Sequence, residues 1–288
     1  MNEYIIFTDS ACDIKLDVLK EWGVECFDLT FRFNGEDKEY SNRDMDTKTF
    51  YDKMRQGGVA KTAAVNPDQA AKAFEEKLAM GYDVLYLGFS TGLSTTYNAG
   101  RIAAESLIAK YPERKILTVD TLSASAGQGL LVYLTLQKKN AGATIEEAAK
   151  FVEDTRLSIC HWFTVDDLVY LKRGGRVSPT VAFVGNMLGI KPVMHVDNDG
   201  HLINVSKARG RKNAIAELAN RYAEYAKTPE EGTIFISQAD CLADAELLAK
   251  LIAEKCGPKV DLITDVGTVI GAHSGPGTLA LFFVGKER

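Results

Sequence analysis

The feature that most constrains the fold is the alternation of short apolar runs with helical patterns over the first half of the chain. Apolar runs predict strands at residues 4–8, 82–89 and 115–120, and a further extended stretch at 24–33. The best-marked helix has Asn66 as its cap, Pro67 at its first position and Gly81 after its end. Other helices are expected at residues 13–22, 94–111, 125–139 and 145–157. Strands that alternate with helices of this length predict a parallel sheet with helices on its faces.

After about residue 158 the pattern changes to hairpins mixed with helices. Residues 190–196 and 201–205 flank Asn198-Asp199-Gly200, which is a strong hairpin signal. We also expect strands at 233–237 and around Leu262 and Leu279, and helices at 164–172, from Ser178 to Gly189, at 211–226 and at 242–256. The predicted fold class is therefore α/β with two domains. Residues 1–158 form the parallel-sheet domain, and residues 159–288 form an α+β domain with a mixed or antiparallel sheet.

Residues 266–285 contain no Asp, Glu, Lys or Arg, and 20 residues are enough for a membrane helix. Five glycines and Pro276 interrupt this stretch, so we expect two short strands around a Gly-Pro turn and no membrane span. A net charge of −5 argues against nucleic-acid binding, which normally needs a basic face. Five cysteines without a C-x-x-C pair argue against a zinc module or disulfide scaffold. With no targeting segment visible, these features predict a soluble cytoplasmic protein.

Residues Gly88 to Gly92 match G-x-S-x-G, the motif of a hydrolase nucleophile elbow, between a predicted strand and a predicted helix. Asp265 and His273 follow Ser90 in the order Ser, Asp, His, which keeps a Ser90/Asp265/His273 esterase as one hypothesis. Two observations weigh against it. No histidine precedes His161, so there is no upstream His-Gly oxyanion loop, and the helix is expected to begin at Ser94 rather than directly after Ser90.

Hydroxyl side chains gather at the start of that same helix, where unpaired N–H groups and the helix dipole attract anions. Ser94 is the central one, and Thr62 stands just before the helix that Asn66 opens. Neutral donors of this kind can hold a carboxylate. Asp9 and Ser10 follow the first strand, where ligands bind in open α/β sheets, and the expected role of Asp9 is to orient a loop. No Asp, Glu or His cluster at metal spacing accompanies Asp9, so no metal is expected.

The segment Gly271-Ala272-His273-Ser274-Gly275-Pro276-Gly277 predicts a tight turn around one histidine, which could donate to an anion or act as a base. The other histidines, in strand-like contexts, are expected to be packing or surface residues. Two basic clusters stand out in an acidic chain. One contains Arg173 and Arg176 at a helix end, and the other contains Arg209 and Arg211 at a helix start, where cations are unfavourable. The second cluster suggests contact with a negatively charged partner or a phosphate. No Gly-Lys-Ser/Thr nucleotide loop exists.

Together these motifs resemble the DegV family over essentially the whole chain. The shared motifs, in family order, are Thr8-Asp9-Ser10, Lys61-Thr62, residues 92–97 (GLSTTY), 168–176 (LVYLKRGGR), 190–192 (IKP), 207–212 (KARGRK) and 271–277 (GAHSGPG). The resemblance implies two α/β domains with one long-chain fatty acid, such as palmitate, between them. It also implies a carrier without a cofactor and without catalytic activity of its own, which presents the carboxylate to an ATP-dependent fatty-acid kinase that makes an acyl phosphate.

Carried over by motif, Thr62 and Ser94 resemble the hydroxyls that hold the carboxylate, with His273 in the same network. Arg173 and Arg176 resemble the basic loop near the head group or the partner. The chain departs from the family pattern at Ala63, where serine is frequent, and at Thr95, where glycine is usual. Two alternatives to the carrier stay open, the esterase and a lipid-binding regulator without a kinase partner.

Overall fold

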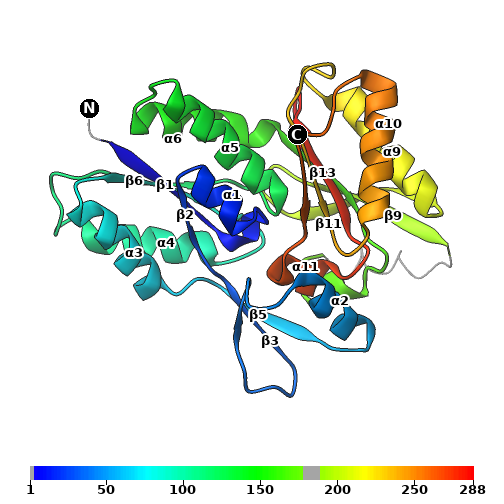
Figure 1. The fold of residues 1–288 in the computed structure, drawn as a ribbon, viewed down its shortest axis with the longest axis horizontal. Coiled ribbons are helices and arrows are strands. Elements are labelled where there is room, and N and C mark those ends of the chain that lie inside the picture. The colour runs from blue at the N-terminus through cyan, green and yellow to red at the C-terminus, as the bar shows by residue number, and fades with distance from the viewer. Residues whose placement is uncertain (1–2, 178–188) are drawn as a thin grey trace.

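The computed structural model describes residues 3–177 and 189–288, and the expected helix from Ser178 to Gly189 falls largely outside them. Among these residues the first half forms a parallel sheet of order β2-β1-β6-β7 (Figure 1). Its strands are β1 (Tyr4–Asp9), β2 (Val24–Phe27), β6 (Asp83–Gly88) and β7 (Ile116–Asp120). The central strands β1 and β6 are buried along nearly their whole length, so helices must cover both faces of the sheet.

One face of this sheet is covered by α1 (Leu16–Glu21), α5 (Ala126–Asn140) and α6 (Ile145–Thr155), and the other by α3 (Pro67–Ala79) and α4 (Thr96–Leu107). The sequence signals explain several of these ends. Asn66 caps α3 by accepting from Asp68 N, and Thr144 and Glu147 form a capping box on α6. Short 3-10 turns follow β1 and α6, as η1 (Ser10–Cys12) and η2 (Arg156–Ser158).

The second half forms a mixed, mostly antiparallel sheet of order β10-β9-β8-β13-β11-β12. Its strands are β8 (Ile159–Thr164), β9 (Ile190–Val196), β10 (Leu202–Arg209), β11 (Ile234–Gln238), β12 (Leu262–Asp265) and β13 (Leu279–Val284). Helices α9 (Arg211–Tyr225) and α10 (Leu242–Cys256) cover its outer face. Its inner face packs against α5 of the first half. The predicted α/β class, with a parallel and then a mixed sheet, is confirmed.

A small antiparallel sheet of order β4-β3-β5 stands beside the two larger ones (Figure 1). It contains β3 (Thr30–Phe33), β4 (Tyr40–Ser41) and β5 (Ala60–Ala63), with α2 (Thr47–Arg55) beside it. The extended stretch predicted at 24–33 is thus wrong as one strand, because β2 and β3 belong to different sheets. Phe31, Phe33, Phe50 and Tyr51 form its own apolar cluster, which also contacts Val266.

Two further predictions for the second half are wrong. Residues 159–164 form the central strand β8, and the helix expected at 164–172 shrinks to α7 (Val169–Arg173). Residues 266–285 do not form two strands, because α11 (Thr268–Ser274) precedes β13. Gly271 lies inside α11, and only a glycine fits there because an added Cβ would be 2.3 Å from the Tyr51 hydroxyl. This glycine therefore allows α2 and α11 to approach each other closely and does not form a turn.

Arg288 fixes the loop between β7 and α5 to the second half. Its Nη1 donates to Leu122 O at 2.8 Å, its Nη2 to Arg156 O at 2.7 Å, and its Nε to Ile159 O at 3.0 Å. These bonds from one partly buried guanidinium join the last residue of the chain to two segments, one at Leu122 and one at residues 156–159, that are distant in sequence. They hold the loop that carries Ser125 against the end of β8.

Candidate functional site

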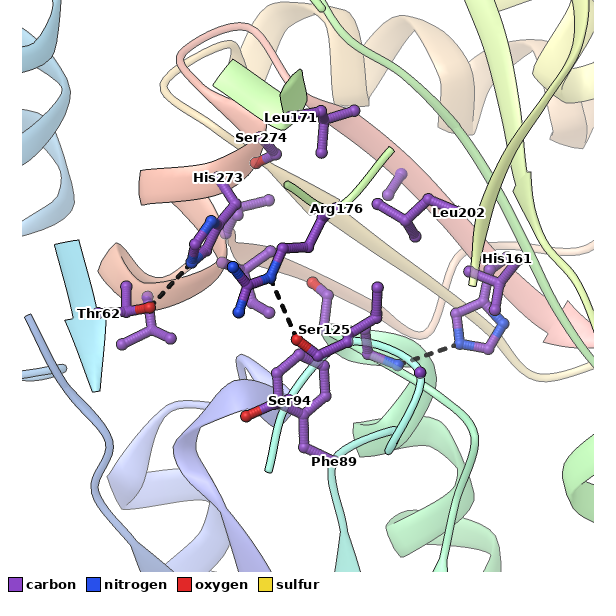
Figure 2. Close-up of a pocket in the computed structure, with 18 of the residues that line it drawn as sticks. Thr62, Phe89, Ser94, Ser125, His161, Leu171, Arg176, Leu202, His273 and Ser274 are labelled. Atoms are coloured by element: carbon purple, nitrogen blue, oxygen red, sulfur yellow. Dashed lines mark hydrogen bonds between the residues drawn. The ribbon is translucent and has the colours of Figure 1, made fainter. Parts of the chain in front are cut away.

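A cavity of about 490 Å³ lies between the carboxyl ends of the parallel strands and the inner face of the second sheet (Figure 2). The first half contributes the loops after β6 and β7, and the second half contributes residues of β8, β11 and β13. Strand ends of a parallel sheet are the usual place for a ligand. The volume falls within the range of small-molecule sites.

Most of the wall is apolar. Its large apolar side chains come from both halves of the molecule and are Leu29, Phe89, Leu93, Phe163, Leu171, Val196, Leu202, Val266, Val269, Ile270 and Phe282. The polar part of the wall includes two groups, which we name the His273 end (Thr62, Ser94, Arg176, His273) and the His161 end (Ser125, His161, Ser237); Asp13 lies behind the second group and accepts from Ser125. The two histidines lie on opposite sides of the cavity in Figure 2. A ligand in this cavity would meet a long apolar surface with polar groups at restricted positions.

At the His273 end, the Thr62 hydroxyl of β5 and Nε2 of His273 on α11 lie 2.8 Å apart (Figure 2). The other ring nitrogen, Nδ1, has no hydrogen-bond partner within residues 3–177 and 189–288. It faces Gly174, where an added Cβ would be only 2.2 Å away. Burial, and then the charge of Arg176, lower the pKa of His273 to about 4, so the ring is neutral at pH 7.

This geometry selects one tautomer of His273. A buried N–H without an acceptor is costlier than a bare ring lone pair, so the proton belongs on Nε2, where Thr62 can accept it. The proton of the Thr62 hydroxyl is then free to be donated to a ligand. His273 thus leaves the Thr62 hydroxyl with a free donor proton at the cavity wall.

Ser94 lies on the loop between β6 and α4 and also lines the cavity. Its Oγ is 2.9 Å from Thr96 Oγ1 and accepts from Thr96 N at 3.2 Å. The helix begins at Thr96, two residues later than predicted, and Ser94 still bonds to its first turn. Thr95 and Ala63, the two departures from the family pattern, line the same cavity.

The two arginines of the first basic cluster have different surroundings. Arg176 lines the cavity, donates from Nε to Leu93 O at 3.2 Å and bonds to Gly174 O, and burial lowers its pKa. In Figure 2 it reaches between His273 and the loop that carries Ser94. Arg173 is exposed, lies 5.7 Å from the centre of the Tyr170 ring and is not part of the cavity wall.

The second basic cluster lies away from the cavity. Arg209 is exposed at the end of β10, whereas Arg211 begins α9. The Arg211 guanidinium donates to Asp244 at 2.8 Å and lies 3.8 Å from Asp166. These carboxylates balance the positive charge at the start of α9, which explains why an arginine is tolerated there.

Asp9 and Ser10 hold the loops beneath the cavity. The buried carboxylate of Asp9 accepts from Phe89 N at 2.9 Å, Tyr86 Oη at 3.0 Å and Ala11 N at 3.2 Å. Burial raises the pKa of Asp9 to about 6 despite these donors. The Ser10 hydroxyl accepts from Leu29 N at 2.9 Å. Both residues therefore bond to backbone next to cavity-lining side chains.

Comparison with known proteins identifies the family to which this chain belongs. The sequence model of the DegV family matches residues 4–286. The chain belongs to the DegV family. A DegV domain-containing protein of Clostridium perfringens is 44% identical over 100% of this chain and 99% of its own length.

Two solved DegV structures cover nearly all of the chain. A fatty-acid-binding DegV family protein from Thermus thermophilus is 27% identical, with a TM-score of 0.88 over 99% of this chain and 100% of the other. A fatty-acid-binding DegV family protein from Streptococcus agalactiae is 26% identical, with a TM-score of 0.86 over 100% of both chains. Both of these DegV family proteins are described as fatty-acid-binding. In this DegV protein, none of the described helices is long and apolar enough to cross a membrane.

The sequence did not predict the His161 end of this DegV cavity. His161 is expected to be a packing or surface residue; it is buried, with Nδ1 2.9 Å from Ile159 O and Nε2 3.4 Å from Ala124 N, and it also lines the cavity wall. The missed signal is the apolar run 159–163, which forms the central strand β8. Beside it, Ser125 Oγ donates to Asp13 Oδ2 at 2.5 Å and lies 2.9 Å from Ser237 Oγ.

The esterase triad is not assembled in this structure. Ser90 is buried and donates to Gly200 O at 3.0 Å, and Asp265 accepts from Gln238 Nε2 at 2.6 Å. His273 uses Nε2 on Thr62, and its Nδ1 faces Gly174. Neither Ser90 nor Asp265 is hydrogen-bonded to His273 in the described part of the chain. The G-x-S-x-G match is a strand-to-helix turn rich in small residues.

Proposed function

We propose that this protein binds one long-chain fatty acid, such as palmitate, in its cavity and presents the carboxylate to a separate ATP-dependent kinase. The observation that carries the proposal is a mainly apolar cavity with the Thr62–His273 pair, Ser94 and Arg176 at one end. Fatty-acid binding by relatives of the same fold and family supports it.

The apolar wall supplies the affinity in this proposal. At about 0.8 kcal/mol for each buried methylene, the roughly fourteen methylenes of a palmitoyl chain contribute about 11 kcal/mol before ordering costs. The head group then contributes orientation more than affinity. Thr62 donates its free hydroxyl proton to the carboxylate, and Ser94 donates from the opposite loop.

The carboxylate must also remain reactive. Two neutral hydroxyls and the half-buried Arg176 leave it less neutralised than a bidentate ion pair in a dry site would. It can then attack a phosphoryl group and become an acyl phosphate. Because the sequence lacks a nucleotide-binding loop, we assign ATP binding and phosphoryl transfer to the partner. Exposed Arg173 and Arg209 are the candidates for contact with that partner.

We further propose that residues 1–158 and 159–288 act as two domains with the ligand between them. The cavity wall supports this division because it takes side chains from both ranges. A ligand in that position would bridge the two sheets and stabilise their contact.

The direct test is mass spectrometry of lipid extracted from the purified protein under denaturing conditions. The expected result is one long-chain fatty acid per chain. Thr62→Val and Ser94→Ala should lower the retained lipid about tenfold each, since each removes a hydrogen bond to a charged group. Ser206→Ala on β10, outside the cavity wall, is the matched control and should retain the lipid. Absence of stoichiometric fatty acid from the wild type would overturn the proposal.

The role as a carrier is tested separately with ATP. Phosphate transfer to the bound fatty acid should require an added fatty-acid kinase, and the protein alone should not hydrolyse esters. Lipid binding without transfer would favour the regulator, and ester hydrolysis that Ser90→Ala abolishes would favour the esterase.

A further inference from the structure

The proposed function leaves the G-x-S-x-G turn between β6 and α4 without a role, because Ser90 is not part of the cavity wall that the described residues form. Its hydroxyl is fully buried and joins the two halves of the chain. Ser90 Oγ donates at 3.0 Å to Gly200 O, at the tip of the β9–β10 hairpin, and accepts from Gly92 N at 3.1 Å. The Ser90 carbonyl accepts from Leu93 N at 3.1 Å and from Ser94 N at 3.0 Å. One residue therefore bonds both to the hairpin and to the backbone of Ser94.

We propose that Ser90 is a positioning residue, through which the β9–β10 hairpin of the second half fixes the place of Ser94 at the His273 end. The head-group site is then complete only when the hairpin is docked on the turn. This inference rests on the proposed function, because it concerns how Ser94 comes to donate to the fatty-acid carboxylate. Ser90 itself contacts no ligand and acts only through the turn that carries Ser94.

The contact between the turn and the hairpin leaves no room for a side chain at either of two glycines. A Cβ added at Gly92 would lie 2.7 Å from Gly200 O and 2.8 Å from Asp199 O. A Cβ added at Gly200 would lie 2.1 Å from Ser90 Oγ. Both glycines are therefore needed for the hairpin to reach Ser90. The small residues of the motif allow the two halves to approach each other, which a local turn alone would not require.

The position of Ser94 depends on this turn. Its own hydroxyl bonds only to Thr96, in the first turn of α4, and residues 90–94 are irregular backbone that neighbouring segments must hold in shape. The second half supplies two of the bonds that do so. One runs from Ser90 Oγ to Gly200 O, and the other from Arg176 Nε to Leu93 O at 3.2 Å. A binding group must be held within about 0.5 Å of its productive position, so a loosened turn would weaken the bond from Ser94 to the carboxylate.

The test is the palmitate affinity of the full-length protein in a lipid-displacement titration. The loss of about tenfold expected for Ser94→Ala is the upper limit for a residue that acts through Ser94. Ser90→Ala should therefore lower the affinity by about threefold to tenfold. In the Ser94→Ala background the same substitution should change the affinity by less than about twofold, because the hydroxyl that Ser90 positions is already absent. A merely structural role of Ser90 would give the same loss in both backgrounds.

Ser123→Ala is the matched control. Ser123 is also fully buried on a strand-to-helix loop, its hydroxyl donates to Thr121 O at 3.0 Å, and it is not part of the cavity wall in the described chain. This variant should lose stability in urea denaturation and keep its palmitate affinity. Wild-type affinity in Ser90→Ala, or a loss that persists undiminished in the Ser94→Ala background, would overturn the inference and leave the proposed function intact. A wild type that does not bind palmitate would overturn both.

A second measurement uses the wild type and does not depend on the folding of any variant. Residues 197–201 at the hairpin tip lie outside the cavity wall, whereas Val196 and Leu202 on either side line it. Because coupling between sites is reciprocal, palmitate should slow amide hydrogen exchange in residues 197–201 by the same factor of about threefold to tenfold. Hexadecanol, which has the same chain without the carboxylate, should slow it less. Equal protection by the two ligands would mean that the hairpin responds to the apolar chain alone, which would contradict the inference.

Discussion

The two histidines that line the cavity differ in how the protein uses their ring nitrogens. His161 has a backbone partner for each nitrogen, at Ile159 O and Ala124 N. His273 has one polar partner, Thr62, and holds the threonine so that a donor remains for a ligand. A cavity residue whose hydrogen-bonding groups all have partners within the protein has a structural role. A residue that leaves a neighbouring donor without an acceptor marks a position where a ligand can bind. The His273 end is therefore expected to control ligand binding, and the His161 end to control stability.

The largest effect should come from Gly127→Ala at the His161 end. The added Cβ would lie 2.3 Å from His161 Nε2 and 2.8 Å from Phe282 Cδ1, and both rings are buried. We expect a loss of about 3 kcal/mol in the free energy of unfolding, as for overpacking in a rigid core. Urea denaturation measures it, and wild-type stability in this variant would break the comparison.

The next effect concerns pH and Asp13. Burial raises the pKa of this carboxyl from its ordinary value of 3.8 to about 8. The folded state therefore binds more protons than the unfolded state between about pH 4 and 8, so Asp13 makes stability fall as pH rises through this window. The lowered pKa of His273 acts in the opposite direction, but only below its ordinary value of 6.5, and the raised pKa of Asp9 acts only up to about 6.

Between pH 6.5 and 8 the slope should thus belong to Asp13. The wild type should lose about 2 kcal/mol of unfolding free energy over this range, and Asp13→Asn should be nearly flat. Urea melts at several pH values compare the two proteins. A slope that survives in Asp13→Asn would show that another group is responsible.

At the His273 end, Gly174→Ala is the counterpart of Gly127→Ala. The new Cβ would be 2.2 Å from His273 Nδ1, so the ring must turn and Thr62 loses its orientation. The backbone of Gly174, with φ of −72°, suits alanine, so stability should change by less than about 1 kcal/mol. Fatty-acid affinity should fall about tenfold in a lipid-displacement titration. An equal loss of stability in the two alanine variants would remove the distinction between the ends.

The smallest effect is expected for Ser237→Ala. Ser125 keeps its bond to Asp13 when the Ser237 hydroxyl is removed, so no buried group is left without a partner. Fatty-acid affinity should change less than about threefold. A larger loss, measured by the same titration, would mean that the His161 end also contacts the ligand through a polar group.

The sequence predicted the elements whose signals are local. The α3 cap at Asn66, the hairpin at Asn198-Asp199-Gly200 and the bounds of α10 depend on neighbouring residues, and the structure confirms them. It did not predict β8, because this apolar run follows the helical pattern of 145–157 without a Gly or Pro that would mark a new element. It also did not predict α11, whose glycines disfavour a helix in isolation. That helix forms because Tyr51 and Gly174 pack against it, and no local pattern contains these contacts.

For the site, the motifs identified Thr62, Ser94, His273 and Arg176 as candidate residues but did not show how they lie relative to one another. The structure gathers these four around one cavity end and leaves Arg173, Arg209 and Arg211 outside the wall. Spacing along the chain could not separate Arg173 from Arg176. The separation depends on how α7 ends at Gly174 beside His273.

Thr62 belongs to the small sheet β4-β3-β5, whose apolar cluster is separate from the cores beneath the larger sheets. A unit of this size can open locally at a lower free energy than the whole molecule, and its amide hydrogens then exchange with solvent during each opening. A fatty acid held by Thr62 on this sheet and by Ser94 on the loop after β6 would have to be released, or lose a bond, whenever β5 detaches. Slower amide exchange in β5 on lipid binding would thus measure the coupling of this small sheet to the rest of the protein.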